Sequence, residues 1–212
     1  MEYIFLNNLD EIKGINAPKS PLGFSKMVKL CESAEMLFDK KGFFQTSIAD
    51  ICRAAHTAVG TFYIYFQDKT AIYNYLVRNY YVVIKRHLNE NIAGLKTRLE
   101  IECAGLRAFI RFGHTHPQCY KIIWGSSYIS PDLFENYYTD FAKSYVRALD
   151  KTPEQIIDVD YSTAAFFLMG IANFICLKTI FNKSPLPESK LDEIIADTRK
   201  ILTEGLFKRK EK

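Results

Sequence analysis

The sequence predicts an all-α fold, and three observations lead to this prediction. Apolar residues recur at three- and four-residue spacing, the period of an amphipathic helix, through most of the chain. One example is the run Met27, Leu30, Cys31, Ala34, Leu37 and Phe38. Ten Gly and seven Pro in 212 residues are too few for a turn-dense β-sandwich, and no alternating run bounded by turn residues demands a strand.

The N-terminal third is expected to hold one long and two short helices. The first, Phe24 to Lys41, follows the breaker-rich stretch Gly14 to Gly23 and stops at Gly42. Thr46 and Ser47 supply an N-cap for a short helix with an apolar face. That face consists of Ile48, Ile51, Cys52 and Ala55.

A brief break at His56 and Thr57 precedes a second short helix, whose apolar pair is Phe62 and Phe66. Asp68 is the expected cap of a long helix that runs to about Ala93. Prolines at or just before the expected helix starts support several of the later segments. These segments are Thr97 to His114, Pro117 to Trp124, Pro131 to Leu149, Tyr161 to Phe181 and Glu188 to Phe207.

Composition and charge narrow the class of protein. A content of 48% hydrophobic and 25% charged residues excludes wholesale disorder. The net charge of +4 is compatible with nucleic-acid binding but does not by itself indicate it. Five scattered Cys, never in a C-x-x-C pair, argue against a disulfide framework and a zinc finger. With no secretory signal in Met1 to Asp10, these features predict a cytoplasmic protein.

One apolar segment, Ala164 to Phe181, could be mistaken for a membrane span. It is interrupted by Asn173 and Lys178, whereas a span needs about 20 predominantly apolar residues. We therefore predict no membrane segment and expect a helix buried in the core or at a dimer seam.

The segment from Thr46 to Lys69 carries the first functional indication. Two short helices joined by a tight break cannot bury enough apolar surface alone, and packing on a third helix gives a helix-turn-helix unit. The second short helix is rich in small and hydroxyl-bearing residues, which suit close approach to the major groove and contacts to phosphates. These are Ala58, Val59, Gly60, Thr61, Tyr63 and Tyr65. Because any amphipathic helix pair can show this spacing, the pattern alone leaves DNA binding open.

Several fixed positions in this region occur in the order and spacing of a known family. The motifs are A-x-x-L-F-x-x-x-G from Ala34, T-S-I-x-D-I from Thr46, and A-x-x-x-x-G-T-F-Y-x-Y-F from Ala55, followed by Lys69. The segment resembles the DNA-binding domain of the TetR family of transcriptional regulators.

The resemblance implies roles for individual residues. Thr46, Tyr63, Tyr65 and Lys69 would contact the DNA backbone. Base-edge or close-approach contacts would come from Ala58, Val59, Gly60 and Thr61. The full predicted DNA-binding set is Thr46, Ser47, Ala58, Val59, Gly60, Thr61, Tyr63, Tyr65 and Lys69. Phe62 and Phe66 would point inward.

Three positions depart from the family pattern. His56 stands where Gly is usual, and a left-handed backbone there would cost about 1 kcal/mol or more. Ala58 replaces a common Ser, so that Thr57 would have to cap the helix, and Val59 replaces a common Lys. Between Phe24 and Thr70, six basic and five acidic side chains leave a net charge of +1, which predicts modest non-specific affinity.

The sequence thus divides into a DNA-binding domain, residues 1–70 with an N-terminal extension at 1–23, and a second domain, residues 71–212. The resemblance implies that the second domain binds an effector and dimerises. Its aromatic residues predict a pocket for a small apolar or aromatic effector, although for each single ring a place in the core is the favoured alternative. The candidates are Phe109, Phe112, Trp124, Tyr128, Phe141, Tyr145, Phe166 and Met169, with Asn173 as a polar handle. His114, His116 and Cys119 match no strong zinc spacing, so neither a metal nor a cofactor is expected.

The last two predicted helices indicate a homodimer. The segment Ala164 to Phe181 is apolar nearly all round, and the next helix carries an apolar stripe. The stripe is Leu191, Ile194, Ile195, Thr198, Ile201, Leu202 and Leu206. Pairing both helices with their two-fold mates would make a four-helix bundle and would predict a pseudo-palindromic operator in double-stranded DNA.

The favoured hypothesis is a transcriptional repressor that an effector releases from its operator by shifting the long helix after Lys69. The alternative is an all-α small-molecule or lipid-binding protein without operator binding, supported by the unusual residues at 56 and 58. An enzyme is not expected, because the sequence has no nucleophile elbow, phosphate loop or H-E-x-x-H motif.

Overall fold

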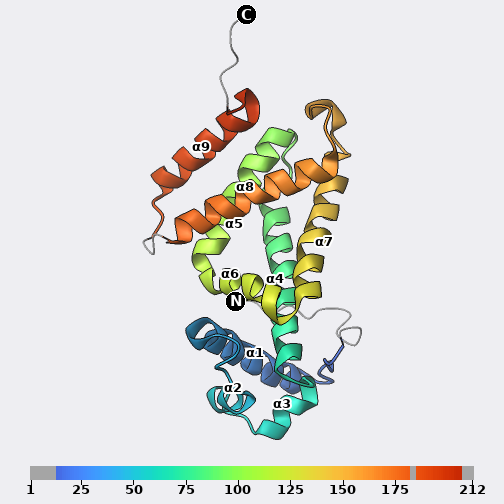
Figure 1. The fold of residues 1–212 in the computed structure, drawn as a ribbon, viewed down its shortest axis with the longest axis vertical. Coiled ribbons are helices and arrows are strands. Elements are labelled where there is room, and N and C mark those ends of the chain that lie inside the picture. The colour runs from blue at the N-terminus through green and yellow to red at the C-terminus, as the bar shows by residue number, and fades with distance from the viewer. Residues whose placement is uncertain (1–12, 182–184, 207–212) are drawn as a thin grey trace, which may run out of the picture. The chain divides into compact units, whose positions relative to one another are not determined.

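The computed structural model describes residues 13–181 and 185–206, and in these ranges it contains α-helices and no β-strand. The all-α prediction is confirmed (Figure 1). The helices are α1 Pro21–Lys41, α2 Ile48–Ala54, α3 Val59–Tyr65, α4 Lys69–Ile92, α5 Arg98–Thr115, α6 Pro117–Ile129, α7 Pro131–Leu149, α8 Tyr161–Phe181 and α9 Glu188–Glu204, with a short 3-10 turn, η2, at Pro153–Gln155. Residues 1–12 of the predicted N-terminal extension and residues 207–212 lie outside the described residues.

Capping residues set most helix ends. Helix α1 starts at Pro21, earlier than predicted, because the side chain of Ser20 accepts a hydrogen bond from the Gly23 amide at 3.1 Å. It ends at Gly42, whose φ of 81° and amide bond to Phe38 O close the last turn. Asp68 Oδ1 accepts from the Ala71 amide at 2.8 Å, which confirms the predicted cap of α4.

Two predicted ends were wrong. Helix α6 continues past Trp124 to Ile129, because Ser126 and Ser127 donate their hydroxyls back to carbonyls three residues earlier and remain helical. Helix α9 ends at Glu204 rather than Phe207, because Gly205 takes a φ of 82° and its amide bonds to Ile201 O.

The chain forms two compact units. Unit 1 comprises the residues up to Val83 together with His116–Tyr138, and unit 2 comprises Ile84–Thr115 together with the residues from Thr139 onward. The long helices α4 and α7 each contribute residues to both units. A functional boundary at residue 70 remains a prediction.

In unit 1, helices α1, α2 and α3 pack against one another, and α6 packs on α1. The core between them consists of fully buried side chains, each contributing about 1.5–3 kcal/mol by leaving water. Its members include Met27, Leu30, Ile51, Phe62, Phe66, Ile72 and Leu76. Tyr73 donates its hydroxyl to Ile122 O, which joins α4 to α6. A Cβ added at Gly125 would lie 2.7 Å from that hydroxyl, so this position requires glycine.

In unit 2, helix α5 packs against both α8 and α9. Arg107 forms an ion pair with Asp192 at 2.6 Å, and Arg111 one with Glu188 at 2.8 Å, so charge pairs accompany the contact of α5 with α9. Part of the predicted dimer stripe on α9 is buried within this unit, namely Leu191, Ile195 and Thr198.

Candidate nucleic-acid interface and effector cavity

Helix α2 begins with a complete capping box. Ser47 Oγ accepts from the Asp50 amide, and Asp50 Oδ2 accepts from the Ser47 amide, both at 3.1 Å. The same Asp50 oxygen accepts from Lys41 Nζ at 2.8 Å. These bonds from Lys41 and Ser47 hold the pKa of the Asp50 carboxyl well below its ordinary value of 3.8.

The turn between α2 and α3 keeps helix-turn-helix geometry despite its unusual residues. His56 adopts a φ of 52°, so the left-handed backbone considered for this position is present. Its amide bonds to Arg53 O at 3.2 Å, and the Thr57 amide bonds to Cys52 O at 2.9 Å, which is a Schellman motif. The expectation that Thr57 caps α3 was wrong: Ala58 is the N-cap residue and supplies no side-chain bond, because alanine has no acceptor.

Helix α3 presents one face to solvent and one to the core. Phe62 and Phe66 are fully buried, which confirms their predicted inward orientation. On the exposed face Val59 is open, and a Cβ added at Gly60 would meet nothing within 4 Å. Tyr63 is 53% exposed. The arrangement gives a short helix held by two phenyl rings and able to approach another surface closely.

The other predicted contact residues differ in exposure. Tyr65 is only 6% exposed, Ala58 is exposed, and Thr61 is half-buried. Thr46 is buried, and its hydroxyl donates to Gly42 O at 2.7 Å. In this structure the Thr46 hydroxyl therefore stabilises the loop between α1 and α2.

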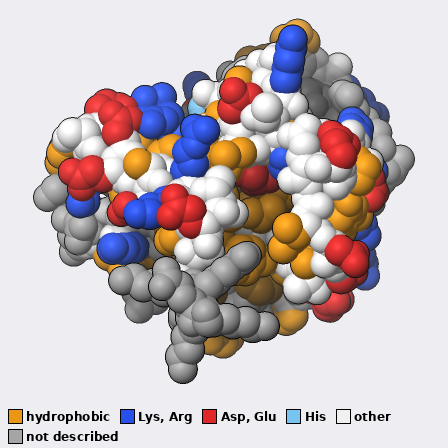
Figure 2. All heavy atoms as spheres, turned by 90° about the horizontal axis from the view of Figure 1, so that it is seen from above, with side chains coloured by type: hydrophobic (Ala, Val, Ile, Leu, Met, Phe, Trp, Pro, Cys, Tyr) orange, Lys and Arg blue, Asp and Glu red, His pale blue; other side chains and the backbone are white. Residues whose placement is uncertain are grey.

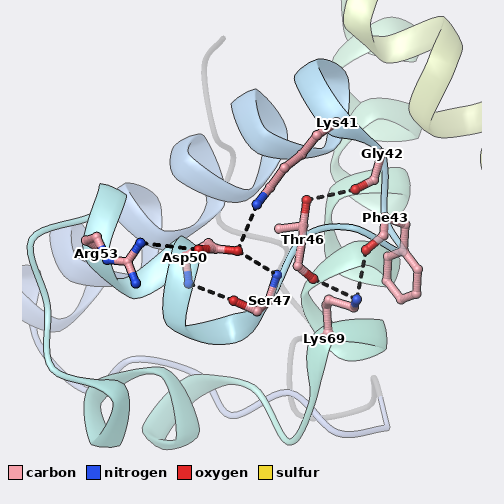
Figure 3. A network of polar contacts seen from close by, with 8 residues as sticks. All are labelled: Lys41, Gly42, Phe43, Thr46, Ser47, Asp50, Arg53 and Lys69. Atoms are coloured by element: carbon pink, nitrogen blue, oxygen red, sulfur yellow. Dashed lines mark hydrogen bonds and ion pairs between the residues drawn. The ribbon is translucent and has the colours of Figure 1, made fainter.

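Lys69 reaches into the same loop from the start of α4 (Figure 3). Its Nζ donates to Phe43 O and to Thr46 O, both at 2.7 Å, and lies 4.3 Å from the centroid of the Phe43 ring. Partial burial, and secondarily the charge of Lys41, lower the pKa of Lys69. Two of its three N–H donors are therefore engaged by the loop that leads into Ser47.

A strap at residues 14–16, which the sequence reasoning missed, fastens the end of α3. The Asn16 amide bonds to Tyr65 O at 2.9 Å, and the Gln67 amide bonds to Gly14 O at 2.8 Å. The Asn16 side chain donates to Ile64 O at 3.0 Å. The two bonds donated by Asn16 satisfy carbonyls at the C-terminal end of α3 that the short helix leaves open. The only sequence signal was Gly14, whose φ of 82° favours glycine.

The three helices described above are covered by a family comparison. Residues 30–76 match the family model of bacterial regulatory proteins of the tetR family. These residues carry the DNA-binding domain of the TetR family. The chain is a DNA-binding transcriptional regulator.

Relatives and solved structures agree with this assignment. The chain is 23% identical over 170 residues to the "Probable HTH-type transcriptional regulator YttP" of Bacillus subtilis, covering 79% of this chain and 80% of that protein. A TetR-family chain from Syntrophomonas wolfei superimposes with a TM-score of 0.73 at 23% identity, covering 87% of this chain and 97% of the other. The fatty acid degradation regulator FadR from Bacillus halodurans gives a TM-score of 0.71 at 15% identity, covering 91% and 100%. At these identities the solved structures share the fold alone.

Unit 2 contains a cavity of about 330 Å³ between α4, α5 and α7. Its walls are mainly apolar, formed by Leu88, Ile92, Leu95, Ile101, Phe141 and Ala148. Tyr145 also lines it, so two of the nine predicted effector residues, Phe141 and Tyr145, lie together here. A volume of this size suits a small ligand.

The other predicted effector residues do not line this cavity. The ring of Phe112 is buried against His87 and does not line the cavity. The side-chain amide of Asn173 donates to Met169 O at 2.8 Å, and Asn173 does not line the cavity either. Phe109 and Met169 likewise lie outside the lining. Phe166 is half-exposed on α8, and Trp124 and Tyr128 are exposed on α6 in unit 1. Their roles as effector contacts remain predictions.

The cavity also has polar residues that the sequence reasoning missed. Arg98 forms an ion pair with Glu102, and the Tyr145 hydroxyl donates to Glu102 Oε2 at 2.5 Å. Lys85 donates to Ser144 Oγ at 3.0 Å. The four-residue spacing of Arg98 and Glu102 on one helix was a signal that could have revealed this pair.

Helix α8 leaves large apolar side chains open to solvent. Phe166, Phe167, Phe174 and Phe181 are each at least half-exposed. By length and composition alone, this helix is long and apolar enough to cross a membrane. That is weak evidence for a membrane span, because the core helix of a soluble protein passes the same test. Figure 2 shows a face on which hydrophobic side chains lie open among basic and acidic ones.

The suspected metal residues form no cluster. Within residues 13–181 and 185–206, no group of three or more His, Cys, Asp or Glu side chains is placed to hold a metal ion. Cys119 is buried, and burial raises the pKa of its thiol well above the ordinary value. A neutral buried thiol is a poor metal ligand.

Proposed function

We propose that this regulator is a cytoplasmic homodimeric repressor that reads a pseudo-palindromic operator through α3. The observation that carries the proposal is the exposed face of α3, where open space over Gly60 adjoins Val59 and the hydroxyl-bearing Tyr63. Small residues allow backbone approach to base edges, and a tyrosine hydroxyl can donate to a phosphate. Ser47, at the N-cap of α2, and Thr61 and Tyr65, on α3, are proposed as further contacts.

The proposed dimer uses α8. Four half-exposed or exposed phenylalanines on one helix exceed what a monomer's surface usually leaves open. A two-fold axis beside this helix would bury each patch against its copy. Ile201 on α9 and Leu206 just beyond its end are exposed and are proposed to join the seam, whereas Leu191 and Ile195 are already buried.

The proposed switch uses α4. This single helix carries Lys69 at one end and the cavity residues Leu88 and Ile92 at the other. An effector that binds the cavity better in one position of α4 would shift the population of DNA-competent dimers. A shift from nearly all bound to nearly all released needs about 5.5 kcal/mol of preference.

The test starts by selecting duplexes from a random library with the purified protein and sequencing them. A palindromic consensus supports the proposal, and failure to enrich any sequence would overturn it. Binding of the selected duplex is then measured for Tyr63→Phe and for the control Tyr128→Phe, which removes a still more exposed hydroxyl from α6. We expect about a fivefold loss for the first, the value of one hydrogen bond, and none for the second. Parent-like binding by Tyr63→Phe would remove that residue from the interface.

A further inference from the structure

The cavity between α4, α5 and α7 combines apolar walls with an excess of positive charge. Lys85, Lys96, Arg98 and Lys151 all line it, and no Asp or Glu does. Glu102, which does not line the cavity, is engaged by the guanidinium of Arg98 and the hydroxyl of Tyr145. An uncharged effector would form no ion pair with these basic side chains.

The basic residues gather at one end of the cavity. Lys96 lies in the connection between α4 and α5, Arg98 begins α5, and Lys151 is the second residue after the end of α7. Within the described chain, Lys96 and Lys151 form no ion pair, so their charges are available to a ligand. Lys85 lies earlier on α4 and donates to Ser144, so it belongs to the cavity wall and not to the end formed by Lys96 and Lys151.

A polar side chain at the same end lacks a hydrogen-bond partner. Thr152 lines the cavity, and its Oγ1 is buried without a partner among the described residues. A buried hydroxyl left unsatisfied costs about 1–3 kcal/mol, which a ligand acceptor would recover. The hydroxyl and the two lysines together make a donor-rich end on an otherwise hydrocarbon-lined space.

We propose that the effector is an amphiphilic anion. Its hydrocarbon tail lies along Leu88, Ile92 and Ile101, and its acidic head lies at the end formed by Lys96, Lys151 and Thr152. This inference rests on the cavity being the effector site, and it replaces a purely apolar effector with one that carries a carboxylate or a phosphate. Both heads accept hydrogen bonds and pair with ammonium groups.

Calorimetry with four probes of one tail length tests the head. Dodecanoate and dodecyl phosphate should bind, whereas dodecanol and dodecyltrimethylammonium should bind at least about tenfold more weakly, because two ion pairs are lost. Tighter binding of one acid identifies the head as carboxylate or phosphate. Dodecanol binding as tightly as both acids would overturn the proposal.

Variants locate the head and the tail separately. Lys151→Met and Lys96→Met should each weaken dodecanoate about fivefold and leave dodecanol unchanged. Lys143→Met, on the exposed side of α7 and outside the cavity, removes the same charge and should change nothing. Gly105→Leu places a side chain in the cavity and should abolish binding of every tail. Equal losses in Lys143→Met and Lys151→Met would show that only net charge matters and would overturn the assignment.

Operator binding separates this inference from the proposed function. Without ligand, all variants should bind the selected duplex like the parent, because none of them alters α3. If the parent binds DNA and dodecanoate but prefers neutral heads, only the effector chemistry is wrong. If the parent binds dodecanoate as described but no duplex, the proposed function fails and the cavity assignment stands.

Discussion

Replacing Lys69 by Met tests whether this residue positions the helix-turn-helix unit or contacts DNA. The substitution keeps a similar chain length and removes two bonds of 2.7 Å to Phe43 O and Thr46 O. A hydrogen bond from a charged donor contributes about 1.5–3 kcal/mol, but water can reach the freed carbonyls in this half-buried loop. We therefore expect the free energy of unfolding to fall by about 2 kcal/mol for both bonds together.

Chemical denaturation at a fixed protein concentration measures this loss, and Lys29→Met, on the exposed side of α1, is the matched control. Operator affinity should fall, because the loop that leads into Ser47 loosens. The slope of log affinity against log salt should stay unchanged, since an ammonium engaged by carbonyls releases no counterion from DNA. A slope reduced by about 0.9 would show a direct phosphate contact, as the resemblance implied, and unchanged stability would refute the value assigned to the two bonds.

Three further predictions concern the cap, the strap and the dimer. Asp50→Asn should be less stable than the parent at neutral pH, and this difference in unfolding free energy should shrink as pH falls below about 4, because a carboxyl with a lowered folded-state pKa stabilises the fold only while it is ionised. Urea unfolding midpoints of both proteins from pH 7 to 2 measure the difference, and a difference that stays constant would contradict the prediction. Asn16→Ala should speed hydrogen exchange at the end of α3 and weaken operator binding about fivefold, and unchanged exchange would show that the strap is dispensable. Phe167→Asp should yield monomers in sedimentation, whereas Ile157→Asp, at a still more exposed apolar residue outside α8, should not; a Phe167→Asp dimer would place the seam elsewhere.

The sequence predicted the parts of the fold that depend on local spacing and capping. Helices α7 and α8 have the predicted bounds, and the caps at Gly42, Ser47 and Asp68 are where the residue types placed them. Such signals lie within a few residues of each other, so they can be read from one chain. The end of α6 was missed because serines that usually disfavour helices bond back to the helix itself.

The details of the site depend on contacts between distant residues. The loop carbonyls that engage Lys69 are 23 and 26 residues away, and the strap joins Asn16 to Tyr65. No periodicity encodes such pairs. The cavity was only partly predicted, because a phenylalanine that lines a cavity and one that fills a core occupy the same helical positions: Phe141 is of the first kind and Phe112 of the second.

The central claim is that the exposed face of α3 approaches DNA closely at Gly60. The affinity of Gly60→Ala for the selected duplex tests it most directly, because a Cβ there meets nothing in the free protein. The account predicts an unfolding free energy no lower than the parent's, together with about a tenfold loss of operator affinity from one disturbed base-edge contact. Parent-like affinity with parent-like stability would contradict the claim.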